Sequence, residues 1–432
     1  MATQEGFAPL QPRTSSGAHP PSTVTELCRQ ARRAARTLAQ LDRGAKDAAL
    51  HAIADALEAR TPEVLEANAR DMDAGREAGL SDALLDRLRL DEGRIATIAA
   101  QVRDIAALPD PVGEVVDGGR LANGLALRRV RVPLGVVGVV YEARPNVTID
   151  AAALCLKSGN AIVLRGSSSA AHSNAVLAAI ASEASGLPAG AVTILRGGRD
   201  ELAELARQNG LVDLIIPRGG EGLKAALEAV ATVPVIYAAS GNCHVYVDAS
   251  ADLDAAERIV VNAKTQRPGV CNAAETLLVH AAAAPAFLPR ALAALRDRGV
   301  ELRVDARART FAGDVPVADA ADEDWDTEYL ALVLAVKVVD SLDEAIEHVG
   351  EHGSGHSEAI VTSDVRAARA FQLGVDAACV YVNASTRFTD GGEFGMGAEI
   401  GNSTQKLHAR GPIGLRELCT YKYLVEGDGH VR

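Results

Sequence analysis

Residues 135–165 read GVVGVVYEARPNVTIDAAALCLKSGNAIVLR, two short apolar runs separated by a segment of helical length. Three more runs follow, each after another helical pattern: AVTILR at 191–196, LVDLIIP at 211–217 and TVPVIYA at 232–238. Nearly continuous Val and Ile runs that alternate with helices are typical of strands buried on both faces of a parallel sheet. This stretch therefore predicts a doubly wound α/β domain, with its ligand at the carboxyl ends of the strands.

A second series of the same kind begins at HVYVD, residues 244–248. It continues through ETLLV at 275–279, LALVLAVKVV at 330–339 and SEAIVTSD at 357–364, and ends with ACVYVN at 378–383. This series predicts a second α/β domain. Because 432 residues are too many for one ordinary core, we expect a functional site between two domains.

The segments around the two series have different patterns. Residues 1–23, rich in Pro, Ser, Gly and Thr, predict a disordered leader, and residues 24–108 predict a helical entry segment. Residues 113–133 contain the alternating run LALRRVRV, which is typical of an arm for subunit contact or of a solvated edge hairpin. Residues 387–432 are Gly-rich at first, and we expect them to end in a helix.

Composition narrows the class of protein. A formal net charge of -13 argues against a nucleic-acid or anionic membrane surface, because both need a basic face. An aromatic content of 3% favours closely packed α/β layers over a β-sandwich. The six cysteines form no CxxC pair, which favours free thiols in the reducing cytoplasm. No apolar stretch approaches the roughly 18 residues that cross a bilayer.

Two turns that follow predicted strands are candidate phosphate cradles, since no GxGxxG follows any of the strands. The first turn places Arg165 before Ser167 and Ser168, and the second, PRGG, places Gly219 and Gly220 before a helix. An arginine fork with serine hydroxyls suits a ribose 2′-phosphate. Ordinary helix capping by Ser and Gly is the alternative.

Cys271 is the candidate nucleophile, in the loop TQRPGVCNAAET. Arg267 and Lys264 are placed to lower the pKa of its thiol, and the backbone amides of Cys271 and Asn272 are placed to face a developing oxyanion. The alternative is a structural role, because most free cysteines are small buried side chains.

For the other candidate side chains, the sequence pattern favours structural roles. Cys243 and His244 are adjacent in a predicted strand and point to opposite faces. His348, His352 and His356 recur every four residues, but glycines end the helix before His356 is reached, so we expect no metal site.

Seven blocks carry a resemblance to a known family: YEARPNVT, LKSGNAIVLRG, LIIPRGG, PVIYAASGNCHVYVD, VNAKTQRPGVCNAAETLLV, YVNASTRFTDGGEFGMGAEI and STQKLHARGPIGL. From residue 24 to its end the chain resembles the aldehyde dehydrogenase superfamily and, within it, the gamma-glutamyl phosphate reductase family. The resemblance implies an aldehyde dehydrogenase-like fold with a cofactor domain at 24–243 and a catalytic domain at 244–386. It also implies an oligomerisation arm at 113–133, and a segment at 387–432 that returns to the cofactor domain and to the oligomer interface.

The resemblance also assigns roles. It implies that Cys271 is the nucleophile and that Asn146 or Arg144 helps to hold the oxyanion. Arg165 corresponds to the residue that contacts the adenosine ribose, Glu328 to the one that holds the nicotinamide ribose, and the PRGG turn lies beside the pyrophosphate. The candidate substrate-binding cations are Arg144, Arg267, Arg387, Lys406 and Arg410.

The implied reaction is the NADPH-dependent reduction of L-glutamate 5-phosphate to L-glutamate 5-semialdehyde through a thioester, the second step of proline biosynthesis from glutamate. The implied partners are further copies of the chain and a functional coupling to glutamate 5-kinase. A hydrolytic aldehyde dehydrogenase and an inactive assembly protein are the alternatives. No carboxylate lies between Thr232 and Asp248, where hydrolytic members carry the Glu that activates water, and this favours the reductase.

Overall fold

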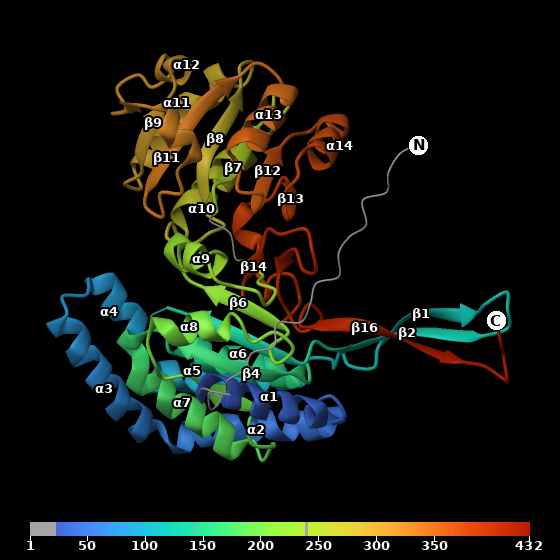
Figure 1. Cartoon of the computed structure of the whole chain (residues 1–432). Helices are drawn as coiled ribbons and strands as arrows, with labels where there is room; N and C mark the ends of the chain where they lie inside the picture. The colour runs from blue at the N-terminus through green and yellow to red at the C-terminus, as the bar shows by residue number, and fades with distance from the viewer. Residues whose placement is uncertain (1–22, 143, 238–240) are drawn as a thin grey trace, which may run out of the picture.

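The computed structural model describes residues 23–142, 144–237 and 241–432, which form two lobes and a projecting arm (Figure 1). The entry segment is helical, as its pattern predicts. Asp42, Ser81 and Asp91 cap three of its helices by accepting backbone N–H groups of the first turn. The helices are α1 (Thr23–Leu38), α2 (Arg43–Ala59), α3 (Thr61–Glu77), α4 (Asp82–Leu88) and α5 (Glu92–Ala107).

The first lobe contains a four-stranded parallel sheet in the order β5-β4-β3-β6. Its strands are β3 (Val136–Tyr141), β4 (Ala161–Gly166), β5 (Val192–Ile194) and β6 (Leu214–Arg218). They alternate with α6 (Asn146–Lys157), η1 (Ser168–Ala170), α7 (Ala171–Ala184), α8 (Arg199–Leu205) and α9 (Glu221–Glu228). The strand order reverses between β3 and β6, so the crevice for a ligand lies at the carboxyl ends of these two strands.

The prediction of a fifth strand at 232–238 is wrong for residues 232–237, which are the part of this run that the structure describes. Only a single bridge joins Val235 to Ile215 of β6. Ile215 donates its N–H to the Pro234 carbonyl, and Ile236 donates to the Ile215 carbonyl. Pro234 has no N–H of its own and cannot extend this pairing into a ladder.

The second lobe contains a seven-stranded parallel sheet in the order β10-β9-β11-β8-β7-β12-β13. Its strands are β7 (Cys243–Val247), β8 (Ala274–His280), β9 (Glu301–Val304), β10 (Ala318–Asp319), β11 (Val333–Val339), β12 (Ser357–Val361) and β13 (Cys379–Val382). The connections contain α10 (Leu253–Thr265), α11 (Ala284–Arg296), α12 (Ala306–Arg309), η2 (Asp322–Asp326), α13 (Leu342–His352), α14 (Val365–Gly374) and η3 (Thr386–Phe388). The sequence pattern predicts five of these strands and misses β9 and β10.

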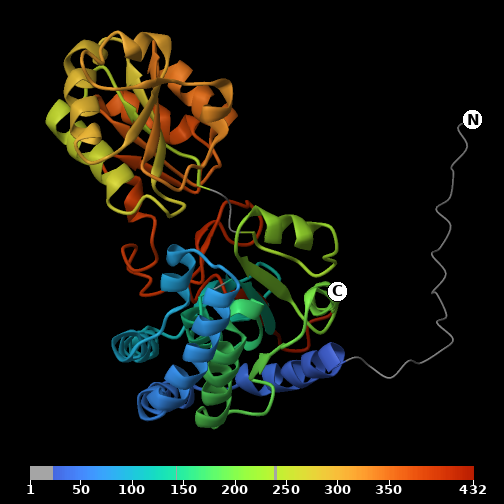
Figure 2. The same cartoon turned by 90° about the vertical axis from the view of Figure 1, so that its left-hand side faces the viewer.

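The two lobes lie apart from each other (Figure 2), and each has its own hydrophobic core. The first core begins at Val24 and takes in Ile400, Ile413 and Leu418 from the far end of the chain. The members of the second core run from Val245 to Val382. They therefore lie between the N-terminal and C-terminal parts of the chain that build the first core. The second lobe is therefore an insertion in the first.

The arm is a three-stranded antiparallel sheet that projects from the first lobe (Figure 1). It consists of β1 (Val115–Arg120), β2 (Ala126–Pro133) and β16 (Cys419–Glu426). The prediction of a terminal helix is therefore wrong: the last segment forms β16, after the short strands β14 (Asn402–Ser403) and β15 (Gly411–Pro412). The run CTYKYLVE is rich in residues that favour strands, and Tyr421 packs beneath Arg129 and Arg131 of β2.

Within the residues that the structure describes, no helix combines the length and the apolar character that crossing a membrane requires.

Candidate active site around Cys271

Cys271 lies between α10 and β8, at the amino end of the second sheet. All six cysteines lie in the described part of the chain and are free, and Cys271 alone among them is half-buried rather than buried. Burial raises the pKa of its thiol, and the charge of Arg218 opposes that shift. The carboxylates of Glu328 and Glu399 raise the thiol pKa further, while the backbone N–H of Cys271 itself lowers it. Arg218 ends β6, so the thiol faces the crevice predicted for the first sheet.

Gly241 fixes the backbone of the cysteine loop. A Cβ atom at this position would lie 1.5 Å from the Cys271 carbonyl oxygen, so only glycine fits. The Gly241 N–H donates to Glu328 Oε1 at 2.7 Å, and the Cys243 thiol donates to the Cys271 carbonyl at 3.2 Å. The entry to β7, the cysteine loop and the Glu328 loop are therefore in direct contact.

A buried ion pair beneath the site holds the Glu328 loop against β8. Lys264 pairs with Glu275, and both side chains are fully buried. Glu275 Oε1 also accepts the N–H of Leu330, whose φ of 53° lies in the left-handed region. Burial raises the pKa of Glu275 to about 7 and lowers that of Lys264. Lys264 thus faces Glu275, whereas the sequence pattern places it at the thiol.

Four arginines gather around the thiol: Arg144, Arg218, Arg267 and Arg387. Burial lowers the pKa of Arg144, and so do the charges of Arg218, Arg87 and Arg267. Burial and Arg267 likewise lower the pKa of Arg387, whose Nε donates to Gln266. Among the described side chains, none of the four arginines around the thiol forms an ion pair with a carboxylate. In a chain of net charge -13, four arginines without an ion-pair partner among the described side chains therefore lie together at the candidate nucleophile.

Asn146 and Arg144, the two candidates for holding the oxyanion, differ in their surroundings. Asn146 opens α6 and donates Nδ2 to Asp150 Oδ2 at 2.8 Å. Burial raises the pKa of Asp150 to about 6. The Arg144 side chain lies close enough to Cys271 that the thiolate charge would raise the arginine pKa.

Five of the six residues predicted to bind a cofactor lie at the carboxyl ends of β4 and β6; the sixth, Glu328, lies between η2 and β11. Arg165 donates Nη2 to the Gly198 carbonyl at 3.3 Å, and the Ser167 hydroxyl contacts that of Ser169. Gly220 caps α9, and its N–H already contacts an anion, the Glu142 carboxylate at 3.4 Å. A cation, hydroxyls and a glycine turn at a helix amino terminus together suit a phosphorylated dinucleotide.

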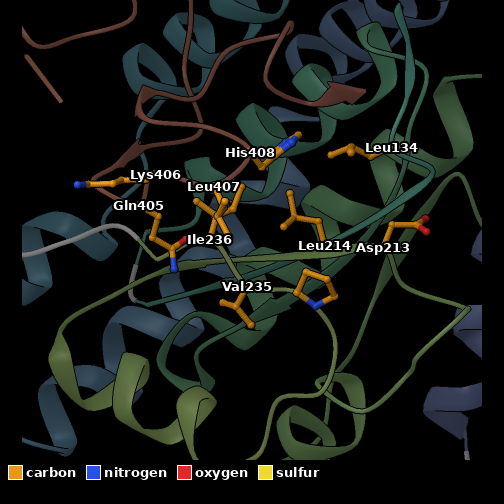
Figure 3. Close-up of a pocket in the computed structure, with 10 residues that line it drawn as sticks. Leu134, Asp213, Leu214, Val235, Ile236, Gln405, Lys406, Leu407 and His408 are labelled. Atoms are coloured by element: carbon orange, nitrogen blue, oxygen red, sulfur yellow. The ribbon is translucent and has the colours of Figure 1, made fainter. Parts of the chain in front are cut away.

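The structure places Lys406 and Arg410 elsewhere. Arg410 Nη1 lies 2.7 Å from Asp376 Oδ1, and Lys406 pairs with the same carboxylate. Lys406 also lines a cavity of about 580 Å³ at the amino ends of β3 and β6. Arg218 lies at the other end of these strands, where β6 finishes. Figure 3 shows the Lys406 side chain at the far end of this cavity from Asp213.

Sequence reasoning missed three residues of the site: Arg218, Gly241 and Glu399. Arg218 stands in the PRGG turn, where the pattern draws attention to the glycines. Glu399 stands in a block that carries the family resemblance, but no spacing rule connects it to Cys271. All three are far from Cys271 in the sequence, so no local pattern indicated that they lie near it.

The histidines singled out by their spacing do not form a common site. His348 lies in α13, which ends at His352, and His356 lies beyond it. Burial lowers the pKa of His348 to about 2 and that of His356 to about 4. In residues 23–142, 144–237 and 241–432, no group of three or more His, Cys, Asp or Glu side chains is arranged to hold a metal ion.

Comparisons with known proteins agree with this architecture. The model of the aldehyde dehydrogenase family matches residues 14–315 and 317–422. A gamma-glutamyl phosphate reductase from Thermobifida fusca is 59% identical over 413 residues, which are 95% of this chain and 98% of the relative. One from Kineococcus radiotolerans is 57% identical over 99% of both chains.

Solved structures give the same result. The crystal structure of gamma-glutamyl phosphate reductase from Thermotoga maritima has a TM-score of 0.93 and 47% identity, and the alignment covers 95% of this chain and 100% of that one. An acetylating aldehyde dehydrogenase from Geobacillus thermoglucosidasius shares the fold at 19% identity, with a TM-score of 0.67 over 95% and 97% of the two chains. The chain therefore belongs to the aldehyde dehydrogenase family, and within it to the gamma-glutamyl phosphate reductases.

Proposed function

We propose that this chain reduces L-glutamate 5-phosphate to L-glutamate 5-semialdehyde with NADPH, the second step of proline biosynthesis from glutamate, and that Cys271 is its nucleophile. The observation that carries the proposal is the group of four arginines, none paired with a carboxylate among the described side chains, around the one half-buried thiol. An acyl phosphate that also bears an α-carboxylate has two anionic ends, and such a group of arginines matches them.

The residues around the thiol have different roles in the proposed reaction. The charge of Arg218 favours the Cys271 thiolate, which attacks the acyl carbon and displaces phosphate to form a thioester. The backbone N–H of Cys271 and either Arg144 or Asn146 stabilise the oxyanion. Arg144, Arg267 and Arg387 bind the anionic ends of the substrate. Lys406 and Arg410 are left out of this set because both pair with Asp376.

The cofactor site lies at the ends of β4 and β6. NADPH supplies the hydride when it is bound. Arg165, Ser167 and Ser168 would hold the 2′-phosphate of the adenosine ribose, and Gly219 and Gly220 would approach the pyrophosphate. Glu328 would hold the nicotinamide ribose, beside the thiol whose pKa it raises.

Other features support the proposed assembly and its location. The three-stranded arm supports a homo-oligomer, because it projects from the lobe and exposes apolar side chains such as Val115, Tyr423 and Val425. Six free cysteines support a cytoplasmic location. Functional coupling to glutamate 5-kinase would pass an acyl phosphate directly between the two enzymes.

The phosphate requirement of the reverse reaction tests the function. The wild-type protein is given glutamate semialdehyde and NADP⁺ in a non-nucleophilic buffer, and NADPH is followed at 340 nm with and without inorganic phosphate. We expect rapid NADPH formation only with phosphate, because the thioester then has a nucleophile. Equal rates without phosphate would mean that water cleaves the thioester, and the hydrolytic dehydrogenase would replace this proposal. The variants Ala238→Glu and Ala239→Glu, which are meant to add the missing base, lie outside the described residues.

A further inference from the structure

We propose that Gln266 is a positioning residue, which aims the guanidinium group of Arg387 at one anionic group of the substrate. The inference rests on the proposed function, and it gives a role to a neutral side chain of the cysteine loop. Gln266 directly follows α10 and lies shortly before Cys271. The phosphate and the α-carboxylate of the substrate offer an arginine the same chemistry, and the test below distinguishes them.

The turn that carries Arg387 is fixed to the cysteine loop through the residue after the nucleophile. Asn272 donates Nδ2 to the Thr389 carbonyl at 2.9 Å and to the Arg387 carbonyl at 3.4 Å. The Thr386 hydroxyl donates to the Asn272 carbonyl at 2.7 Å. Asn272, Thr386 and Thr389 are all buried, so water does not weaken these hydrogen bonds. The backbone of η3 therefore has a defined place beside Cys271.

The hydrogen bond to Gln266 then sets the direction of the Arg387 side chain. Arg387 Nε donates to Gln266 Oε1 at 2.8 Å. The Gln266 backbone N–H ends α10 by donating to the Asn262 carbonyl, so the end of the helix does not depend on the Gln266 side chain. A single bond at Nε orients the planar guanidinium group, which would otherwise turn with its flexible stem.

This arrangement leaves the outer fork of Arg387 for an anion. A guanidinium group has five N–H donors, and Gln266 takes the single donor on Nε. Within the part of the chain that the structure describes, no hydrogen bond or ion pair occupies Nη1 or Nη2 of Arg387. Two parallel N–H groups match the two oxygens of a carboxylate or of a phosphate. Arg387 can therefore bind such a group end-on while Gln266 still holds Nε.

The neutral character of Gln266 matters as much as its position. Burial lowers the pKa of Arg387, and the charge of Arg267 lowers it further. A thiolate at Cys271 and the carboxylate of Asp390 act in the opposite direction. A carboxylate at position 266 would neutralise Arg387 and compete with the substrate. An amide oxygen accepts the same hydrogen bond and leaves the positive charge available to an anion.

The test measures anion binding at the thiol without turnover. Iodoacetamide alkylates Cys271 in the presence of either inorganic phosphate or L-norvaline, at constant ionic strength, with Cys271→Ala as the blank. Norvaline has the α-amino and α-carboxylate groups of glutamate and no second anion, so each ligand represents one end of the substrate. The concentration that halves the alkylation rate is compared with the rate of the same variant without ligand, so a change in thiol pKa alone cancels.

Gln266→Met keeps the length of the side chain and removes the acceptor. We expect the half-protecting concentration of one ligand to rise about tenfold, the usual contribution of a charge-assisted hydrogen bond, while that of the other stays within twofold. The ligand that responds identifies the group that Arg387 binds. In the NADPH assay, the KM for phosphate or for glutamate semialdehyde should rise to match, with kcat within threefold of the wild type. Gln266→Glu should weaken the same ligand further, because it neutralises Arg387.

Two comparisons show whether Gln266 acts through Arg387. In an Arg387→Met protein, adding Gln266→Met should change neither the protection nor the KM, because the partner is already absent. Gln372→Met is the matched control, since Gln372 is an exposed glutamine of α14 in the same lobe, and it should match the wild type. Gln266 is itself exposed, so its variants should keep the thermal unfolding midpoint of the wild type.

Four results would overturn the inference. The first is a wild-type thiol that neither ligand protects, and the second is unchanged protection in Gln266→Met. The third is an equal loss of affinity for both ligands, which would indicate a general disturbance of the cysteine loop. The fourth is a further loss on adding Gln266→Met to Arg387→Met. A wild-type protein whose thiol is protected but which lacks phosphate-dependent activity would instead contradict the proposed function.

Discussion

Replacing Gly241 with alanine is expected to disable the site through the backbone of Cys271. The added Cβ atom would lie 1.5 Å from the Cys271 carbonyl oxygen and 2.2 Å from its carbonyl carbon, while real Cβ contacts almost never fall below 3.0 Å. The two backbones must therefore separate by about 1.5 Å. A misplacement of about 1 Å costs a reaction on the order of a hundred-fold, so kcat should fall at least that far.

The assay is phosphate-dependent NADPH formation, measured together with the thermal unfolding midpoint. Overpacking of this kind also lowers stability by about 1–3 kcal/mol, which leaves a folded protein to assay. Gly350→Ala is the control, because a Cβ atom on Gly350, in α13, meets nothing within 4 Å. A Gly241→Ala protein that keeps turnover within threefold of the wild type would refute the reasoning, since it would show that the cysteine loop does not need this contact.

Three further variants test the residues named above. Cys271→Ala should abolish turnover by several orders of magnitude while fluorescence titration shows nearly unchanged NADPH affinity, and a tenth of the wild-type rate would contradict its role as nucleophile. Arg165→Ala should weaken NADPH binding by about 1–3 kcal/mol and NADH binding much less, whereas equal losses would make Arg165 structural. Arg218→Gln should raise the thiol pKa and slow the alkylation of Cys271 by iodoacetamide at neutral pH; unchanged alkylation would remove Arg218 from the activation of the thiol.

The sequence pattern predicts the two parallel sheets because strands buried on both faces are continuous apolar runs. Such runs can be recognised without knowing which strands pair with them. It fails where a partner or a single residue decides the outcome. Pro234 reduces the run at 232–238 to a bridge within the described residues. The run CTYKYLVE becomes a strand because β2 lies beside it, and β9 is too short and too charged to stand out.

The candidate site divides in the same way. Cys271, Arg144, Arg267 and Arg387 lie in blocks that carry the family resemblance, and the structure brings them together. Lys406 stands in such a block too, yet the structure pairs it with Asp376. Spacing along the chain cannot reveal which cations already have a carboxylate partner, nor that Arg218, the last residue of β6, acts on a thiol of the other lobe.

The insertion of one lobe into the other sets the order in which a newly made chain can fold. All strands of the second sheet are synthesised without interruption, so this lobe can fold as soon as it leaves the ribosome. The first lobe must wait for Leu418, and its arm must wait longer, because Arg128 of β2 and Glu426 of β16 are 298 positions apart. A chain whose translation stops before β16 therefore presents a finished inserted lobe beside an arm in which the edge of β2 has lost its partner, the kind of surface that recruits chaperones, proteases or other unfinished chains.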